Sequence, residues 1–526
     1  MIRMERTKNA SRNIIFGTML KGYQIFIPFL MRTAMIYLMG VQYLGLNSLF
    51  VSILSVLNLA ELGVGSAMVY SMYKPIAEGD CDSICALMRL YRTYYRIIGG
   101  VIAGVGVAVT PFIPKLINGD VPDNINVYIL YLLNLGATVL TYWLFAYKNS
   151  ILQAYQRTDI VSKITLATST VQYGFQLWVL WAFHNYYYYV IVMLATQALT
   201  NIITAVCVNK LYPQYNPKGK LSKKEVKKIN RRIRDLFTAK LGSVVVNSAD
   251  TIVISSFLGL TILAIYQNYY FILTAIISFV SVIFTSVMAG IGNSIITETK
   301  QKNFADLKLF TFIISWIAGV CVCCFLVLYQ PFMEIWVGKD LMLDFSAVVC
   351  FCIYYFVYEI NQLLNTYKDA AGIWHEDRFR PLITAGTNLI LNLIMVQFYG
   401  IYGVLLSTVI STLFIGMPWL LHNIFTMLFD KRNLKEYLQN LLFYIVVVGV
   451  TCTIVYLVCL PIDIGKWLSL IVKAVVCVIT SNIVFIVLFH NRYEFKASLK
   501  LVNKISNGKI SFMSKKMKME KHYEKH

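Results

Sequence analysis

Residues 309–330, LFTFIISWIAGVCVCCFLVLYQ, contain no charged side chain. About 20 apolar residues are enough to cross the hydrocarbon core of a bilayer as a helix. Inside a bilayer every backbone N–H and C=O must be bonded within the protein, so an isolated apolar run of this length has to be helical. Thirteen further stretches of the chain have a similar character. The sequence therefore predicts an all-α, polytopic membrane protein.

The composition of the whole chain agrees with this fold class. Of the 526 residues, 58% are hydrophobic and only 14% are charged, whereas an average soluble domain has about 25% charged residues. This balance excludes a water-soluble enzyme. The net charge of +21 would suggest nucleic acid in a soluble protein, but here the basic residues lie between apolar runs, and we expect no nucleic-acid partner.

The predicted membrane spans alternate with loops of unequal charge. The fourteen candidate spans are 13–38, 44–72, 94–114, 125–147, 161–183, 187–209, 237–258, 264–292, 309–330, 344–366, 381–399, 402–425, 441–460 and 466–489. The two termini and every second loop hold 41 of the 47 Lys and Arg residues, and the other loops hold 3. By the positive-inside rule, both termini are predicted to be cytoplasmic.

Weak internal repetition indicates two lobes. A shift of 219 residues places Lys21 on Lys240 and Gly40 on Gly259. Two six-helix lobes, related by a pseudo-two-fold axis along the membrane normal, would enclose a substrate cavity. The predicted parts are an N-terminal lobe at 1–209, a basic linker or surface helix at 210–236, a C-terminal lobe at 237–425, two additional helices within 426–490, and a basic cytoplasmic tail at 491–526.

Two cations in the first predicted span are candidate ligand-binding residues. Lys21 and Arg32 are eleven residues apart, which is three helical turns plus about 20°, so both project from one face. A charge at the centre of a membrane helix costs about 2.5–3.5 kcal/mol on insertion scales, so it should face protein or a wet cavity. Two stacked cations suit an anionic ligand, and Arg can bind phosphate oxygens in bidentate fashion.

Further polar candidates lie in the second, seventh and tenth predicted spans. These are Glu61, Asp250 with Asn247 and Lys240, and Glu359. As functional groups, the carboxylates would adjust the charge of a cavity or accept protons. The alternative is interhelical ion pairing that only holds helices together, and Lys240 could simply extend its ammonium to the membrane boundary.

Signals for an enzyme are weak. Asp80-Cys81-Asp82 has the D-x-D spacing that glycosyltransferases use to hold a metal, but no nucleotide-binding domain surrounds it. His375-Glu376-Asp377 is interpreted as a polar loop. No phosphate-binding glycine loop is found, so we expect a transporter without an ATP site, metal or other cofactor. Active transport would then use an ion gradient or a substrate gradient.

Three segments resemble a known family. They are GVQYLGLNSLF at 40–50, AELGVGSA at 60–67 and YKP at 73–75. They resemble bacterial polysaccharide-biosynthesis membrane proteins, the oligosaccharide-lipid flippases of the multidrug/oligosaccharidyl-lipid/polysaccharide exporter superfamily. The resemblance implies a two-lobed protein of the plasma membrane that moves a polyprenyl-pyrophosphate-linked oligosaccharide to the outer face by alternating access. It also implies membrane lipids, and polysaccharide assembly proteins, as partners.

Alternative functions remain open from the sequence. One sister branch of the superfamily exports cationic drugs with sodium or protons, although its cavity needs net acidity. Another flips the peptidoglycan precursor lipid, and the charge pattern does not exclude it. A polytopic glycan polymerase or transferase would need a large extracytoplasmic loop, whereas the outward loops predicted here are short. A membrane scaffold would not need buried charges.

Overall fold

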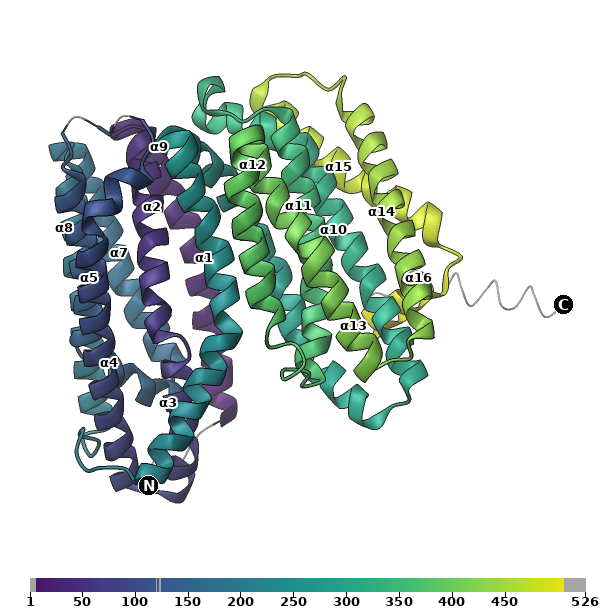
Figure 1. Cartoon of the computed structure of the whole chain (residues 1–526). Coiled ribbons are helices and arrows are strands. Elements are labelled where there is room, and N and C mark those ends of the chain that lie inside the picture. Colours follow the sequence, from purple (N-terminus) through teal and green to yellow (C-terminus); the bar gives the residue numbers. More distant parts are fainter. Residues whose placement is uncertain (1–5, 120, 123, 506–526) are drawn as a thin grey trace. The chain divides into compact units, whose positions relative to one another are not determined.

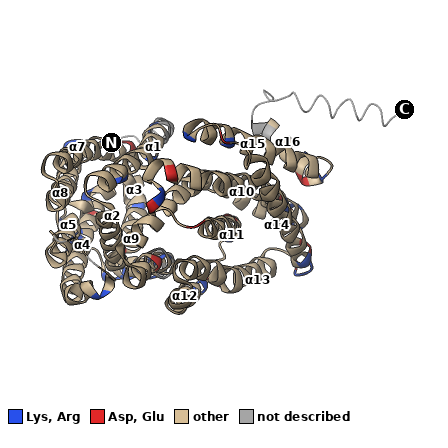
Figure 2. Cartoon of the chain, turned by 90° about the horizontal axis from the view of Figure 1, so that it is seen from above, with Lys and Arg blue, Asp and Glu red and all other residues tan. Residues whose placement is uncertain are grey.

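The computed structural model describes residues 6–119, 121–122 and 124–505. All regular secondary structure in these ranges is helical (Figure 1). By length and composition, nine helical stretches of the described residues can cross a membrane, or ten if one bent pair is counted as a span. Figure 2 shows Lys and Arg as isolated blue patches on ribbons that are otherwise mostly tan. The predicted fold class, an all-α polytopic membrane protein, is confirmed.

The contacts divide the chain into two compact units, which are Met1–Phe271 with Pro381–Ser411, and Ile272–Arg380 with Thr412–His526. The first unit begins with eight α-helices. They are α1 (Arg6–Leu38), α2 (Val41–Leu57), α3 (Val64–Glu78), α4 (Cys81–Val109), α5 (Val127–Trp143), α6 (Asn149–Ala154), α7 (Thr158–Phe183) and α8 (Tyr186–Leu211). Short 3-10 helices at Asn58–Glu61, Thr110–Leu116 and Ala146–Lys148 lie between them. In this unit α1 packs against α7, α7 against α8, and α4 against α5.

Two long helices contribute to both units, and each is interrupted at a glycine. Helix α9 (Lys223–Thr297) has non-helical backbone at Gly259, with φ 88° and ψ 173°. Helix α12 (Arg380–Ser411) has it at Gly400, with φ 55° and ψ −131°. Helix α9 begins inside the predicted basic linker and continues without interruption as far as Gly259. The stretch of α9 that is long and apolar enough to cross a membrane starts at Lys240, after the basic segment.

The second unit is built around α10 (Lys300–Val337). The remaining elements are α11 (Phe345–Ala370), a π-helical segment at Thr412–Gly416, α13 (Met417–Met427), α14 (Arg432–Cys459), α15 (Lys466–Phe489) and α16 (Tyr493–Ile505), with a 3-10 turn at Lys339–Leu341. Helix α10 packs against α11, α14 and α15. Aromatic rings fill this core, where Trp316 stacks on Phe485 with 5.9 Å between centroids. Of the predicted basic tail, α16 is helical and residues 506–526 lie outside the described residues.

The second predicted span, 44–72, is not one continuous helix. Helix α2 ends at Leu57, a 3-10 turn follows, and α3 starts only at Val64. Gly63 between them has φ 87° and ψ −18°, a left-handed conformation that L side chains rarely adopt. A Cβ atom on Gly63 would also lie 2.6 Å from the Cβ of Leu236. The break therefore requires glycine for its backbone conformation and for space.

Candidate functional site

The break between α2 and α3 holds Glu61, the last residue of the 3-10 turn. The hydroxyl of Tyr95 donates to Glu61 Oε1 at 2.5 Å, and the hydroxyl of Tyr142 lies 2.7 Å from Oε2. Tyr91 donates in turn to the Tyr95 hydroxyl at 2.6 Å. These rings come from α4 and α5 and are each at most 7% exposed. Two buried donors thus fix the orientation of the carboxylate without neutralising its charge.

A pocket of about 350 Å³ opens beside this carboxylate. Its lining residues are Ser55, Asn58, Glu61, Leu62, Gly63, Gly65, Ser66, Lys240 and Val244. The structure thus brings together two predicted site residues, Glu61 from the helix break and Lys240 from α9. The pocket offers a carboxylate, an amide, two hydroxyl groups and an ammonium group, which is a set of groups that can bind sugar hydroxyls together with an acidic group.

Arg32 lies elsewhere in the same unit, in contact with α9. Its Nη1 donates to Oδ1 of Asn268 at 3.2 Å, and its guanidinium lies 5.1 Å from the centroid of the Phe271 ring. Within the described residues, no carboxylate forms an ion pair with Arg32, and the Nδ2 of Asn268 is buried without an acceptor. The half-buried cation is therefore held by a neutral amide and an aromatic face.

Lys21, the other cation of α1, is exposed. It forms no hydrogen bond or ion pair with a residue that the structure describes, and it does not line the Glu61 pocket. The predicted pair of stacked cations thus consists of one half-buried guanidinium and one exposed ammonium.

Asp250 accepts two hydrogen bonds from α12. The Nδ2 of Asn392 donates at 2.6 Å and the hydroxyl of Thr408 at 3.3 Å. Asn388 donates to Thr408 at 2.8 Å, and Ser407 donates to Asn392. Sequence reasoning did not identify these partners, although amide and hydroxyl residues repeated at helical spacing in an apolar run are the signal that could have found them. The site is a carboxylate within a buried network of neutral polar groups.

Glu359 is not joined to these sites. Glu359 lies on α11 in the second unit, where its side chain is 1% exposed. Neither of its carboxylate oxygens has a hydrogen-bond partner among the described residues. The side chain of Asn247 lies outside the described residues.

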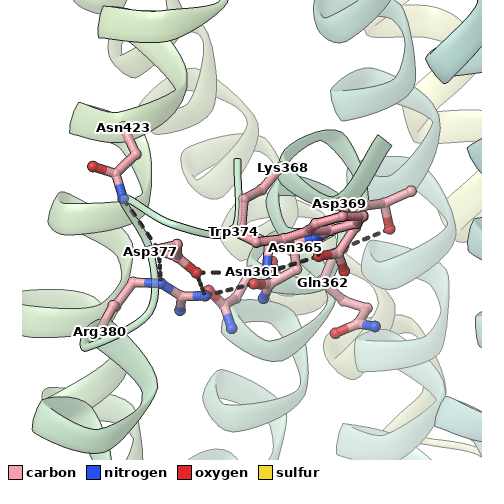
Figure 3. Close-up of polar contacts among 10 residues, drawn as sticks. Asn361, Gln362, Asn365, Lys368, Asp369, Trp374, Asp377, Arg380 and Asn423 are labelled. Atoms are coloured by element: carbon pink, nitrogen blue, oxygen red, sulfur yellow. Dashed lines mark hydrogen bonds and ion pairs between the residues drawn. The ribbon is translucent and has the colours of Figure 1, made fainter. Parts of the chain in front are cut away.

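The segment at 375–377 lies in a loop, as predicted, with His375 and Glu376 exposed and Asp377 buried. Asp377 is only 3% exposed and accepts two hydrogen bonds from Arg380, at 2.6 and 2.7 Å (Figure 3). Asn423 of α13 donates to the same carboxylate at 3.2 Å, and the Nζ of Lys368 lies 3.5 Å away. Arg380 also donates to Asn365 at 2.7 Å. This ion-pair cluster connects α11, α13 and the start of α12, because buried charges need such partners.

The D-x-D segment has a structural role at the start of α4. Asp80 caps this helix by accepting a hydrogen bond from the backbone N–H of Ser83 at 2.9 Å. Its hydrogen bonds with Ser83 hold the pKa of Asp80 below the ordinary value. This geometry accounts for Asp80 as a helix cap.

Comparisons with known proteins matched one protein family and several solved structures of membrane transporters. The family described as polysaccharide biosynthesis protein matches residues 10–289. The lipid II flippase MurJ, in an inward closed conformation, is 15% identical with a TM-score of 0.69, over 91% of this chain and 99% of MurJ. An inward-facing multidrug resistance MATE family transporter of the MOP superfamily is 14% identical with a TM-score of 0.59, over 78% and 96%. The Vibrio cholerae MATE transporter VcmN is 16% identical with a TM-score of 0.52, over 80% and 98%.

No curated protein matches the chain at a significant level. The structural neighbours share too little sequence to indicate a substrate. What they establish is the fold, which is that of a multi-pass membrane transporter.

Proposed function

Because this chain belongs to the polysaccharide biosynthesis protein family, we propose that it is a flippase for a lipid-linked oligosaccharide. Its substrate is an oligosaccharide joined to a polyprenyl pyrophosphate, the repeat unit of a surface polysaccharide. It carries this substrate from the cytoplasmic to the outer face of the bacterial plasma membrane by alternating access. The sugar head crosses through a polar cavity while the lipid tail stays in the bilayer.

The observation that carries this proposal is the pocket shared by Glu61 and Lys240. Broken membrane helices typically form substrate sites in transporters, because they place polar groups inside the bilayer. Glu61 lies four residues beyond the end of α2, whose 17 residues span about 25 Å along the helix axis. In the proposed topology this position is on the cytoplasmic side, where the substrate is made. The hydroxyl and amide groups of the pocket bind sugar, and Lys240 binds phosphate.

Arg32 supplies a second positive charge in the same unit. Its present partner, Asn268, is neutral, so the guanidinium exchanges one hydrogen bond when it binds an anionic head group. Lys21 lies about three turns earlier on α1 and is exposed. Together the two residues form the cationic path that the sequence predicts for a diphosphate.

The proposed topology has fourteen spans and cytoplasmic termini. Two of the apolar stretches, Lys240–Thr297 and Arg380–Met427, have 58 and 48 residues, long enough for two spans each, and each contains a glycine with non-helical backbone. Gly40 and Gly259, which correspond in the predicted repeat, both have positive φ, 112° and 88°. This correspondence supports two related lobes at 1–209 and 237–425, followed by two additional helices.

Asp250 is proposed as the site that couples transport to an ion gradient. Its carboxylate is surrounded by neutral amide and hydroxyl groups of α12, which can reorient when the carboxylate binds or releases a cation. Transport that is driven by an ion gradient in this way requires no nucleotide hydrolysis. Glu359, buried and without hydrogen bonds among the described residues, is a second proposed protonation site.

The function is tested by reconstituting the protein in liposomes that contain a fluorescent polyprenyl-pyrophosphate oligosaccharide. Lys240→Gln and Arg32→Gln should each reduce the flipping rate at least tenfold, whereas Lys74→Gln, at a cation that is 82% exposed, should not. Lipid II and a cationic dye are assayed in parallel. Faster flipping of lipid II, or export of the dye alone, would assign the protein to one of the two alternative branches.

A further inference from the structure

Lys473 is a charged residue within the membrane that the proposed transport path does not use. It lies on α15, seven residues after Lys466 at the start of this helix, which is about 10 Å along the axis. Its side chain is half-buried. It forms no hydrogen bond or ion pair with a residue that the structure describes. A charge at this depth is costly without a partner, so the missing partner needs an explanation.

Neighbouring cations at the same end of the unit do have a carboxylate. The Nζ of Lys466 lies 3.2 Å from Oε1 of Glu334, and the Nζ of Lys339 lies 3.9 Å from the same oxygen. These cations are 70% and 79% exposed. Lys473, which is deeper, is thus the cation for which the described part of this region provides no anion.

A pocket of about 160 Å³ lies directly beside Lys473. Helix α10 contributes Gln330 and Pro331, and α14 contributes Tyr456. Because Pro331 has no N–H, the carbonyl of Val327 in the pocket wall lacks its usual helical donor. The pocket is large enough for a phosphate group and less than half the volume of the pocket beside Glu61.

The rim of the pocket is apolar and exposed. Phe345, the first residue of α11, is 40% exposed, and Leu460, directly after α14, is 62% exposed. Both residues lie at helix ends, so the pocket is close to the level of the lipid head groups. A ligand with one anionic group and an adjoining hydrocarbon chain would place the anion on Lys473 and the chain along this rim.

We propose that this pocket binds the phosphate group of a membrane lipid, with Lys473 as its counter-ion. Lysine binds phosphate as a point charge, and the hydroxyl of Tyr456 is a polar group that can contact the rest of the head group. The amide nitrogen of Gln330 donates to the backbone carbonyl of Leu343 at 2.6 Å and so belongs to the wall of the pocket. The lipid stabilises the junction of α10, α14 and α15. The site lies wholly in the second unit and does not depend on the transported substrate. The two sources of such a phosphate are an anionic phospholipid and a polyprenyl phosphate.

Native mass spectrometry of the purified full-length protein tests this proposal. The protein is titrated with phosphatidylglycerol, polyprenyl phosphate and, as a zwitterionic comparison, phosphatidylcholine. Wild-type protein should retain one of the anionic lipids at least tenfold better than Lys473→Met and Lys473→Gln. Lys473→Arg should restore retention, and Lys466→Gln, on the same helix, serves as the matched control and should behave like wild type.

Each outcome of the titration either identifies the bound lipid or contradicts the proposal. Lys473-dependent retention of phosphatidylglycerol alone identifies a phospholipid site, and retention of polyprenyl phosphate alone identifies a carrier site. Equal retention by wild type and Lys473→Met, equal loss in Lys466→Gln, or no preference over phosphatidylcholine would overturn the proposal. Melting curves recorded for each variant ensure that only folded protein is compared. Two neutral variants of different polarity are included so that misfolding of one does not prevent the test.

Discussion

At the scale of single residues, the carboxylate of Glu61 is held on both oxygens by hydrogen bonds from tyrosine hydroxyls. Hydrogen bonds to a charged group contribute about 1.5–3 kcal/mol each, which is roughly a tenfold to hundredfold effect. We expect Glu61→Gln to slow flipping at least tenfold, because the glutamine keeps the shape but not the charge. Tyr142→Phe should have a smaller effect, since Tyr95 still holds the other oxygen. The measurement is the flipping rate in liposomes.

The control for this pair is Tyr131→Phe. The Tyr131 hydroxyl donates to the backbone carbonyl of Gly106 at 3.0 Å, and the residue is fully buried in the same unit without contacting Glu61. If Tyr131→Phe slowed flipping as much as Tyr142→Phe, the effect would come from general packing and not from the orientation of Glu61.

A substitution at Asp250 can remove the negative charge of the side chain while keeping its hydrogen bonds. Asn in its place can still accept from Asn392 with its oxygen and can donate to the hydroxyl oxygen of Thr408 with its amide nitrogen, but it cannot bind a cation by charge. We expect Asp250→Asn to keep the melting temperature within a few degrees while flipping no longer responds to an imposed ion gradient. Gradient-dependent flipping of the variant at the wild-type level would remove Asp250 from the coupling step.

At the scale of helices, the cluster around Asp377 predicts a stability effect. Removing one partner of a buried ion pair costs about 3–5 kcal/mol, because it leaves an uncompensated charge. Asp377→Asn should therefore lower the melting temperature in detergent by roughly 5–10 °C. Asp369→Asn is the matched control, since Asp369 is 39% exposed and pairs with Lys368 at the surface of the same cluster. Similar losses in both variants would contradict a specific role for the buried pair.

A second ion-pair cluster, at the start of α7, predicts that the stability of the folded protein depends on pH. The side chain of Asp159, at the start of α7, is fully buried and pairs with Arg157 at 2.9 Å and Lys163 at 3.5 Å. Burial alone would raise the pKa of Asp159, but the hydrogen bonds and charges of these two partners outweigh it and lower the pKa below its ordinary value. A lowered folded pKa stabilises the protein above the unfolded pKa, near 4, and this stabilisation is lost as the pH falls through the folded pKa.

Wild type and Asp159→Asn are therefore compared by thermal unfolding in detergent between pH 3 and pH 7. The wild-type advantage in melting temperature should be constant from pH 7 to about pH 5 and shrink below pH 4. An advantage that persists unchanged at pH 3 would show that the carboxylate acts there through packing and not through its charge.

The helix interruptions show which features of the helices could be predicted from the sequence and which could not. Hydropathy located the apolar segments because length and composition determine insertion into a bilayer. It could not locate the break at residues 58–63, because two polar residues, Asn58 and Glu61, are too few to end the apolar run, and only Gly63 indicates a left-handed backbone. The partners of Asp250 and Asp377 were missed for a similar reason. They come from distant segments, and without the fold nothing in their spacing connects them.

At the scale of the whole molecule, the resemblance found in residues 40–75 is confirmed by the family match over residues 10–289. The resemblance rests on a short glycine-containing motif in and around the second predicted span, because apolar helices elsewhere match one another too easily to indicate a family. The same motif contains Glu61 and Gly63, which form the helix break. The sequence could thus indicate the place of the pocket but not its tyrosine walls, which depend on how α4 and α5 pack.

The alternation of charge between loops leads to a last prediction, on topology. Positive loops are retained in the cytoplasm, so Cys81, which is exposed and is the first residue of α4, should be cytoplasmic. In a variant with Cys81 as its only cysteine, a membrane-impermeant maleimide should react only after the cells are permeabilised. In the same background with Cys81 replaced, Asp463→Cys, between α14 and α15, should react in intact cells. Because an error in the number of spans between these loops would place both on one side, labelling of both positions in intact cells, or of neither, would contradict the fourteen-span topology.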